Sequence, residues 1–300
     1  MKMKKFLLPV LFIGVFAACQ KENETSIIQS DVQPTEAKIA GITSITLPAT
    51  YSQKLLMELY STVSCATCPD SDQKFKNYAT AHPDKIYGVN IHTADGMNST
   101  QFMVLDALYT ITQYSSGSFN RLPYAGTPVI HKTKWATSNM VNTCLAKTAK
   151  CGLKINSAFT GNVLNTTVTA GFAQSMTGNY SLSVYLMENG VTGTGFGFNQ
   201  ANYYNNIAGS QWYQLGNPII GYVHNNVLRK VATPGTGTPI ASTNIIPGGS
   251  YTSTLNIDCT GYNKANLYVI AFINKVGTSS TTHEIMNVQQ VKAGLNKAFD

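Results

Sequence analysis

The chain has 300 residues, enough for one large or two ordinary domains, and its 43% hydrophobic content is sufficient for packed cores. Only 12% of the residues are charged, and polar uncharged residues are abundant, which is typical of an exported, β-rich protein rather than a cytosolic enzyme. The formal net charge is +7, and three of the lysines lie in an N-terminal segment that we expect to be removed, which leaves +4. That charge is too small to indicate nucleic acid as a partner, and no basic stripe with interleaved aromatic residues is present.

The first nineteen residues predict a lipoprotein signal peptide. A basic segment, Met1–Lys5, precedes an apolar core, Phe6–Phe16, that is too short to span a membrane. The small residues Ala17 and Ala18 then lead to Cys19, as in the lipobox of bacterial lipoproteins, where cleavage occurs before the cysteine and its sulfur is lipidated. Several acyl chains on Cys19 would hold the protein stably at a membrane. The alternative is an ordinary signal peptide that is cut elsewhere.

Residues 20–43 are predicted to form a disordered tether, because they are polar and lack any period. The segment Gln20–Glu24 resembles the short acidic tag that sends Bacteroidetes lipoproteins to the outer face of the outer membrane; the alternative is a solvated linker. No later apolar stretch reaches transmembrane length. We therefore expect a protein that is lipid-anchored at the outer membrane, with the membrane as a partner through Cys19 and display on the cell surface as an open question.

The central motif is a pair of cysteines between a predicted strand and a predicted helix. The apolar run Leu55–Tyr60 has the composition of a buried strand, and it is followed by Cys65, Cys68 and Pro69. Strand, tight turn with Cys-x-x-Cys, and helix form the pattern of a thioredoxin-like redox site. Residues i and i+3 lie close together in the first helical turn, so the sulfurs can join, and the helix dipole favours a thiolate at Cys65.

Two other interpretations of the cysteine pair are a zinc site and a structural disulfide. A zinc site needs further ligands, and no second Cys-x-x-Cys or spaced histidine pair follows at a suitable distance. A purely structural disulfide stays open. We expect no metal and no cofactor.

The predicted N-terminal domain, residues 44–150, continues with alternating elements. The expected order is a helix over 69–82, a strand over 86–92, a helix over 98–114, a loop over 115–125, a strand from 129, and a helix over 137–150. Cys144 lies on the apolar face of the last helix, so we expect a buried small hydrophobic side chain rather than a reactive thiol. Whether Cys151 and Cys259 pair is left open by the sequence.

Thr127 and Pro128 are the residues expected to face the cysteines. Thioredoxin-like proteins place a cis-proline at the start of a strand opposite Cys-x-x-Cys, and the preceding residue offers its backbone to an extended substrate. The sequence Thr127-Pro128, followed by β-branched residues, fits this position. The alternative is Leu122-Pro123.

Two titratable residues are weaker candidates for the site. Glu58 is the only carboxylate near the place of the buried aspartate that relays protons in thioredoxin; the alternative is a residue at a strand edge paired with a lysine. His92 ends the neighbouring predicted strand and is a candidate base or charge partner of Cys65; the alternative is a structural histidine.

The predicted C-terminal domain, residues 151–300, consists of short runs with strand-like alternation, separated by turns. The sequence Tyr180–Leu186 alternates polar with apolar residues, which predicts a strand with one wet face. An insertion at 189–221 is rich in Gly, Asn and Tyr and is interpreted either as a loop that contacts a glycan or a protein, or as an ordered Ω-type loop. The pattern favours an antiparallel, immunoglobulin-like β-sandwich, so the expected fold class is α+β. The runs are 153–159, 163–170, 180–187, 223–231, 250–257, 267–273 and 284–291.

The pattern as a whole resembles the outer-membrane lipoproteins of about twenty-eight kilodaltons that are known from Bacteroidetes. The resemblance rests on the lipobox, on Glu58–Pro69 with its cysteine pair, on Val89–His92, and on Tyr222–Arg229 in the sandwich. It implies a thioredoxin-like domain joined to a β-sandwich at the outer membrane. It brings no established substrate.

Two functions follow from these observations. The first is thiol–disulfide exchange on exported proteins, in which Cys65 reacts, Cys68 resolves the mixed disulfide, and Thr127-Pro128 holds the partner chain. Its partners are protein thiols and disulfides. The second is a surface binding or adhesion lipoprotein, in which Cys65–Cys68 is a permanent structural disulfide and the sandwich loops contact a ligand.

Overall fold

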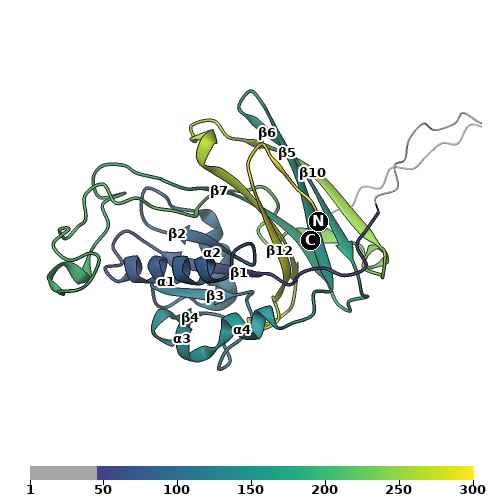
Figure 1. The fold of residues 1–300 in the computed structure, drawn as a ribbon, viewed down its shortest axis with the longest axis horizontal. Helices are drawn as coiled ribbons and strands as arrows, with labels where there is room; N and C mark the ends of the chain where they lie inside the picture. Colours follow the sequence, from purple (N-terminus) through teal and green to yellow (C-terminus); the bar gives the residue numbers. More distant parts are fainter. Residues whose placement is uncertain (1–45) are drawn as a thin grey trace, which may run out of the picture. The chain divides into compact units, whose positions relative to one another are not determined.

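Two β-sheets organise residues 46–300, which are the part of the chain that the computed structural model describes (Figure 1). The predicted signal peptide with Cys19 and the predicted tether at 20–43 lie outside the described residues. The fold of residues 46–300 is mixed α/β and consists mostly of strands. No helix in this part of the chain combines the length and the apolar character that a membrane crossing needs.

The larger sheet has nine strands in the order β12-β11-β7-β8-β2-β1-β3-β4, with β9 paired to β7. The first four strands are β1 (Leu55–Ser61), β2 (Ile86–His92), β3 (Ser116–Phe119) and β4 (Ile130–His131). The others are β7 (Tyr180–Glu188), β8 (Val227–Val231), β9 (Thr238–Ile240), β11 (Leu267–Lys275) and β12 (Ile285–Lys292). Strands from both sides of residue 150 therefore share one sheet, and the predicted division into two domains at that residue stays a prediction.

The smaller sheet has four strands in the order β10-β6-β5-β13. They are β5 (Cys151–Thr160), β6 (Val163–Phe172), β10 (Ser250–Asp258) and β13 (Asn296–Lys297). Its apolar face packs against one face of the larger sheet, and side chains such as Leu153 and Val168 meet Leu182 and Val269 there. All seven strands that the sequence predicted beyond residue 150 are present, at shifted ends.

Strand β7 is buried on both faces, so the prediction of one wet face is wrong. Leu182 and Val184 face the smaller sheet, whereas Tyr185 and Met187 belong to a second core on the opposite face. The serines that suggested a solvated face are buried as well, and Ser183 donates a hydrogen bond to Asn274 at 2.8 Å. The alternation therefore reflects two different buried surfaces.

The α-helices lie in the first half of the described chain. They are α1 (Cys68–Ala81), α2 (Thr100–Tyr109), α3 (Trp135–Ser138) and α4 (Met140–Leu145). The 3-10 turns occur in both halves and are η1 (Lys132–Lys134), η2 (Tyr203–Asn206), η3 (Ser242–Asn244) and η4 (Lys264–Asn266). The single helix predicted over 137–150 is wrong. The chain forms two short helices because Asn139 between them adopts a left-handed conformation, with φ of 55°.

Strand β3 lies where the sequence predicted a loop. Its residues are Ser-Gly-Ser-Phe, which have little strand propensity apart from the last. The small residues are required by the neighbour, because a Cβ atom on Gly117 would lie 2.7 Å from the carbonyl oxygen of Glu58. Small residues therefore allow β3 to approach β1 closely, and for the same reason β3 lacks the apolar pattern from which a strand is predicted.

A buried ion pair joins Glu58 on β1 to Arg121, beside the core that contains Phe272. The Glu58 carboxylate is fully buried and accepts hydrogen bonds from Arg121 Nε at 2.8 Å and from Ser118 Oγ at 2.9 Å. The guanidinium of Arg121 also lies over the ring of Phe272, 5.3 Å from its centroid. The interpretation of Glu58 as a residue at a strand edge paired with a lysine is wrong, because β1 is an interior strand and the partner is an arginine.

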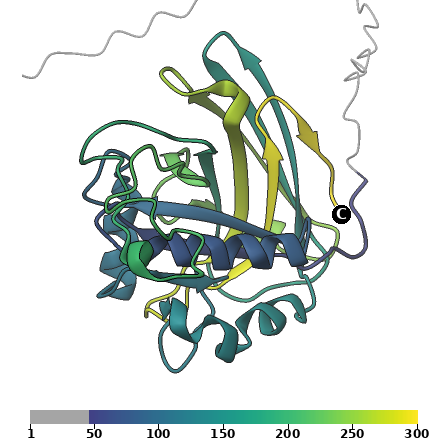
Figure 2. The same ribbon diagram turned by 60° about the vertical axis from the view of Figure 1, so that its left-hand side comes forward.

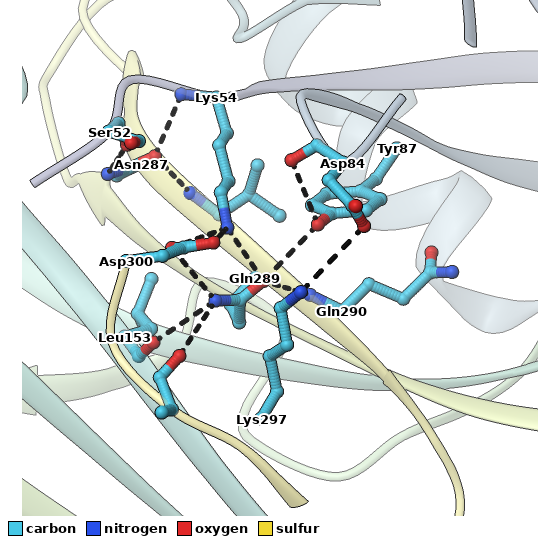
Figure 3. A network of polar contacts seen from close by, with 12 residues as sticks. Ser52, Lys54, Asp84, Tyr87, Leu153, Asn287, Gln289, Gln290, Lys297 and Asp300 are labelled. Atoms are coloured by element: carbon cyan, nitrogen blue, oxygen red, sulfur yellow. Dashed lines mark hydrogen bonds and ion pairs between the residues drawn. The ribbon is translucent and has the colours of Figure 1, made fainter. Parts of the chain in front are cut away.

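A second polar network ties the C-terminus to the start of β1 (Figure 3). Lys54, 2% exposed, donates from Nζ to Asp300 at 2.6 Å and to Gln289 at 2.9 Å. The side chain of Asn287 accepts from the Lys54 backbone N–H and donates to the carbonyl of Cys151. Asp300, which is itself exposed, thus pairs with a buried lysine directly before β1 and with Gln289 on β12.

Three cysteines are unpaired and buried within the described residues. Cys144 packs in the core between β1 and α4, which confirms the predicted buried side chain, and burial raises the pKa of its thiol to about 12. Cys151 and Cys259, whose pairing the sequence left open, both carry free thiols.

The Glu58–Arg121 pair generates a stability prediction. Replacing Arg121 by Met leaves the Glu58 carboxylate buried without its cation, so the free energy of unfolding should fall by about 3–5 kcal/mol. The double variant Glu58→Leu, Arg121→Met should recover most of this loss, because no buried charge is left alone. Urea unfolding of the three proteins measures both effects. A loss below about 1 kcal/mol in the single variant would show that the pair is not critical.

Candidate functional site

A disulfide joins Cys65 and Cys68 at the point where β1 ends and α1 begins. Their Cα atoms are 5.4 Å apart, and Pro69 occupies the first turn of the helix, where its missing N–H costs nothing. Cys65 is partly exposed, whereas Cys68 is 1% exposed. Cys65 is therefore the more accessible of the two cysteines to an incoming thiol.

Ser115 is the residue that faces both sulfurs. Its hydroxyl lies 3.3 Å from Cys65 Sγ and 3.5 Å from Cys68 Sγ, and 2.8 Å from the hydroxyl of Thr67. Ser115 is fully buried, has φ of 61°, and directly precedes β3. It therefore holds the place opposite the cysteines at which the sequence analysis expected a cis-proline. No sequence signal singled it out, because it fell inside a predicted loop.

The prediction of a cis-proline at Thr127-Pro128 is wrong. Within residues 46–300, the one cis peptide bond joins Asn217 and Pro218. Both the backbone N–H and the carbonyl of Thr127 are bonded to Tyr124, so they are not free to receive another chain. The cause of the error was the missed strand β3, which made β4 look like the first strand of the hairpin.

The register of the hairpin shows which residues approach the cysteines instead. Ser116 pairs with His131, and the N–H of Lys132 donates to the carbonyl of Ser115 at 2.9 Å. Thr127 and Pro128 lie toward the other end of β3. The structure thus does not bring them to the disulfide.

Lys132 places a cation beside the cysteine turn. Its side chain is 7% exposed, and Nζ donates to the Thr67 carbonyl at 3.0 Å, to Asp70 at 2.7 Å and to the hydroxyl of Tyr204 at 2.6 Å. The Lys132 ammonium group neutralises Asp70, which lies in the first turn of α1. Asp70 therefore disfavours a thiolate at Cys65 less than its position in the sequence implies. A lysine in a polar run after a short strand gave no signal in the sequence.

The long insertion after β7 packs on the cysteine turn, as Figure 2 shows beside the start of α1. Gln200 is buried and donates from Nε2 to the carbonyls of Val63 and Cys65, at 3.2 and 2.9 Å. The N–H of Tyr203 donates to the carbonyl of Ala66 at 2.9 Å. Segments about 135 residues apart thus form one surface around the disulfide.

The two weaker candidates lie in separate polar clusters. Glu58 is occupied by Ser118 and Arg121, so its oxygens are committed away from the cysteines. His92 is 1% exposed, and its Nδ1 lies 2.7 Å from the Asp95 carboxylate, which also accepts from the N–H of Val63. His92 therefore contacts the segment that leads to the cysteines through Asp95.

A second histidine packs on His92. The ring centroids of His92 and His224 are 5.5 Å apart, and burial lowers the pKa of His224 to about 4. His224 Nε2 lies 2.9 Å from the carbonyl of Phe198 in the insertion. Within residues 46–300 no group of three or more His, Cys, Asp or Glu side chains is arranged to hold a metal ion.

Asp72 is a carboxylate near the site that the sequence analysis did not assign. It lies one helical turn beyond Cys68 on α1, and its oxygens accept from Asn90 Nδ2 at 3.0 Å and from the Tyr222 hydroxyl at 3.4 Å. Burial raises its pKa to about 6, although both hydrogen bonds oppose the shift. A group with this pKa changes its charge close to neutral pH.

The comparison with known families gives one decisive match. A model of the outer membrane protein Omp28 family matches residues 103–297, about two thirds of the chain. The chain belongs to the Omp28 family. The matched range includes Ser115, Lys132 and the insertion but begins after the cysteine pair, so membership in the Omp28 family does not itself bear on Cys65 and Cys68.

Two solved structures resemble this Omp28-family chain. HBP35 of Porphyromonas gingivalis is 18% identical, with a TM-score of 0.66 over 81% of this chain and 76% of that one. Protein AGR_C_4864 of Agrobacterium tumefaciens is 11% identical, with a TM-score of 0.51 over 81% of this chain and 95% of that one. At these identities the likeness concerns the fold alone. A search of curated proteins gave no match.

The raised pKa of Asp72 generates a pH prediction. The folded chain holds a proton on this carboxyl up to about pH 6, whereas the unfolded chain releases it near pH 3.8. The contribution of Asp72 to the free energy of unfolding therefore decreases as the pH rises between those two values. Asp72→Asn should match the wild type near pH 4 and exceed its free energy of unfolding by about 1–2 kcal/mol at pH 7. Urea unfolding of both proteins across this range measures the difference. A difference that does not change with pH would contradict the assignment.

Proposed function

We propose that this Omp28-family protein carries out thiol–disulfide exchange on exported proteins, with Cys65 as the reacting sulfur and Cys68 as the resolving one. The observation that carries the proposal is the difference in exposure within one disulfide at a helix start, with Cys65 accessible and Cys68 buried. A purely structural bridge does not require such a difference.

The exchange proceeds by two displacements. A thiolate of the client attacks Cys65 Sγ, the bond to Cys68 breaks, and Cys68 leaves as a thiolate, which yields a mixed disulfide between the client and Cys65. A second client thiolate then attacks the client sulfur and releases Cys65 as a thiolate. The client gains a disulfide, and this protein is left with two thiols. The same steps in reverse reduce a client disulfide.

Three groups support a thiolate during these steps. The hydroxyl of Ser115 lies within hydrogen-bonding distance of both sulfurs and can donate to whichever carries the charge. The Lys132 ammonium group lies beside the turn, on the carbonyl of Thr67. The N-terminus of α1 adds its positive partial charge at Cys65.

We also propose a thioredoxin-like arrangement for residues 44–150 and an immunoglobulin-like β-sandwich for residues 151–300. Support for the first comes from parallel β1 and β2, antiparallel β3 and β4, and α1 directly after the cysteines. Support for the second comes from the apolar contact between the smaller sheet and strands β7 and β11.

We further propose that the protein is anchored at the outer membrane through lipidated Cys19. The support is the lipobox-like sequence and the membership in an outer membrane protein family. Cys19→Ala should move the protein from the membrane fraction to the soluble fraction of lysed cells, because the lipid supplies the attachment. Retention of the variant in the membrane fraction would contradict lipid anchoring, and protease treatment of intact cells tests surface display separately.

A binding lipoprotein with a permanent disulfide is the competing function. It is favoured by the hydrogen bonds from Gln200 and Tyr203 to the cysteine turn, since they rigidify the segment that must move when the disulfide opens. In that case the insertion would act as the contact surface.

Trapping of the mixed disulfide separates the two functions. In cells, Cys68→Ala should accumulate covalent adducts through Cys65, visible as reducible bands of higher mass, because the resolving sulfur is gone. The matched control Cys65→Ala should give none, since Cys68 is buried. Absence of adducts from Cys68→Ala, in a protein that is folded by circular dichroism, would support the permanent disulfide.

A further inference from the structure

A groove with a volume of about 610 Å³ runs along helix α1, on a different face from the one that Lys132 contacts. Its walls come from α1, from β1 and β2, from the insertion and from residues 222–226 that follow it. Six amide side chains line it, and we call it the amide groove. They are Gln73, Asn90, Asn189, Gln211, Asn225 and Asn226. Its size is that of a site for a small molecule or a short chain.

Three aromatic side chains also line the amide groove, Phe75 on α1 and, on the facing segments, Trp212 and Tyr222. The ring of Trp212 packs on Tyr204, with centroids 5.1 Å apart, and Tyr204 is held by Lys132. The ring of Tyr222 packs on His224 at 4.8 Å. The rings of Trp212 and Tyr222 are therefore fixed in place without a ligand, so little conformational entropy is lost on binding.

The amide groove offers almost no net charge. One carboxylate, Asp72, and one ammonium group, Lys76, line it. Asp72 is already bonded to Asn90 and Tyr222. Such a lining does not attract phosphate groups or acidic chains, which require clustered cations. The occupant indicated by the charge is an uncharged polar molecule.

One wall group lacks a hydrogen-bond partner. Asn90 is 3% exposed, and among residues 46–300 its Oδ1 accepts from no donor. Buried amide oxygens are almost always paired, and because this oxygen is itself covered, a ligand donor reaches it only after a small movement of the groove wall. At the rim, Gln211 is exposed and its amide makes no hydrogen bond to the described residues, which leaves both of its groups available.

We propose that the amide groove binds an uncharged carbohydrate chain, with the face of one sugar ring on Trp212 and its hydroxyls on the surrounding amides. Sugar hydroxyls both donate and accept hydrogen bonds, as side-chain amides do, and the C–H face of a sugar ring matches an aromatic surface. Grooves for peptides rely on an open strand edge or an apolar trench, whereas six of the sixteen residues that line this groove carry amides and the aromatic rings stand among them.

The two tryptophans of the chain make the test direct. Trp135 is 1% exposed in the core, whereas Trp212 lies in the groove, so a ligand there changes the emission of Trp212 and leaves that of Trp135 as an internal check of folding. The probes are neutral oligosaccharides built from glucose, mannose, galactose or N-acetylglucosamine, added to the mature protein. At least one should give a saturable change in emission.

Variants then locate the site by calorimetry. Trp212→Ala should weaken binding by about tenfold or more, and Gln211→Ala by a few-fold, because it removes one rim amide without disturbing other contacts. The control Phe196→Ala, fully exposed on the same insertion and outside the groove, should bind as the wild type does.

Two results would overturn the proposal. One is no binding of any neutral oligosaccharide at millimolar concentration, with or without binding of an unstructured peptide. The other is sugar binding that both Trp212→Ala and Gln211→Ala retain. The double variant Cys65→Ala, Cys68→Ala should bind the sugar as the wild type does, so failure of this proposal and failure of the redox proposal are distinguishable.

Discussion

The position of the disulfide depends on strand β1, which is paired along its whole length with β2 and over Met57–Tyr60 with β3. Its seven residues are buried, with β2 parallel on one side and β3 antiparallel on the other. A shift of β1 by one residue would turn Glu58 away from Arg121 and place a charge against an apolar core. The buried ion pair thus fixes the register of β1, and the register fixes where the cysteine turn emerges from the sheet.

Segments that are far apart in the chain then build the surroundings of that turn. Ser115 arrives at the start of β3, Lys132 follows β4, and Gln200 comes from an insertion after β7. Each contributes a contact that the others do not: a hydroxyl at the sulfurs, a cation at the Thr67 carbonyl, and an amide on the Cys65 carbonyl. The same insertion forms a wall of the amide groove, so the contacts that hold the turn also position Trp212.

Sequence reasoning succeeded where a pattern was local. The apolar runs of β1 and β2, the cysteine pair and the strands beyond residue 150 were predicted because periodicity and spacing carry that information. The error at β3 had a physical cause: the strand is accommodated by the absence of side chains at Gly117, so it carries no apolar signal. That one omission moved the expected contact with the cysteines from Ser115 to Thr127-Pro128.

The remaining residues of the site were beyond single-sequence reasoning for a different reason. Lys132 contacts the cysteine turn through Thr67 and Asp70, more than sixty residues away in the chain. Asp72 is buried by segments as distant as Tyr222. The burial of β7 on both faces likewise depends on which strands neighbour it, and alternation alone does not encode that. Family membership, shown over residues 103–297, confirmed the resemblance without reaching the cysteines.

The reduction potential of Cys65–Cys68 in the mature protein, measured by equilibration with glutathione redox buffers, tests the central claim most directly. An exchanging disulfide should equilibrate with glutathione and have a potential in the range of thioredoxin-type couples, about −120 to −270 mV. A potential below about −300 mV, with no exchange toward glutathione, would contradict the account and identify the bond as a permanent part of the fold.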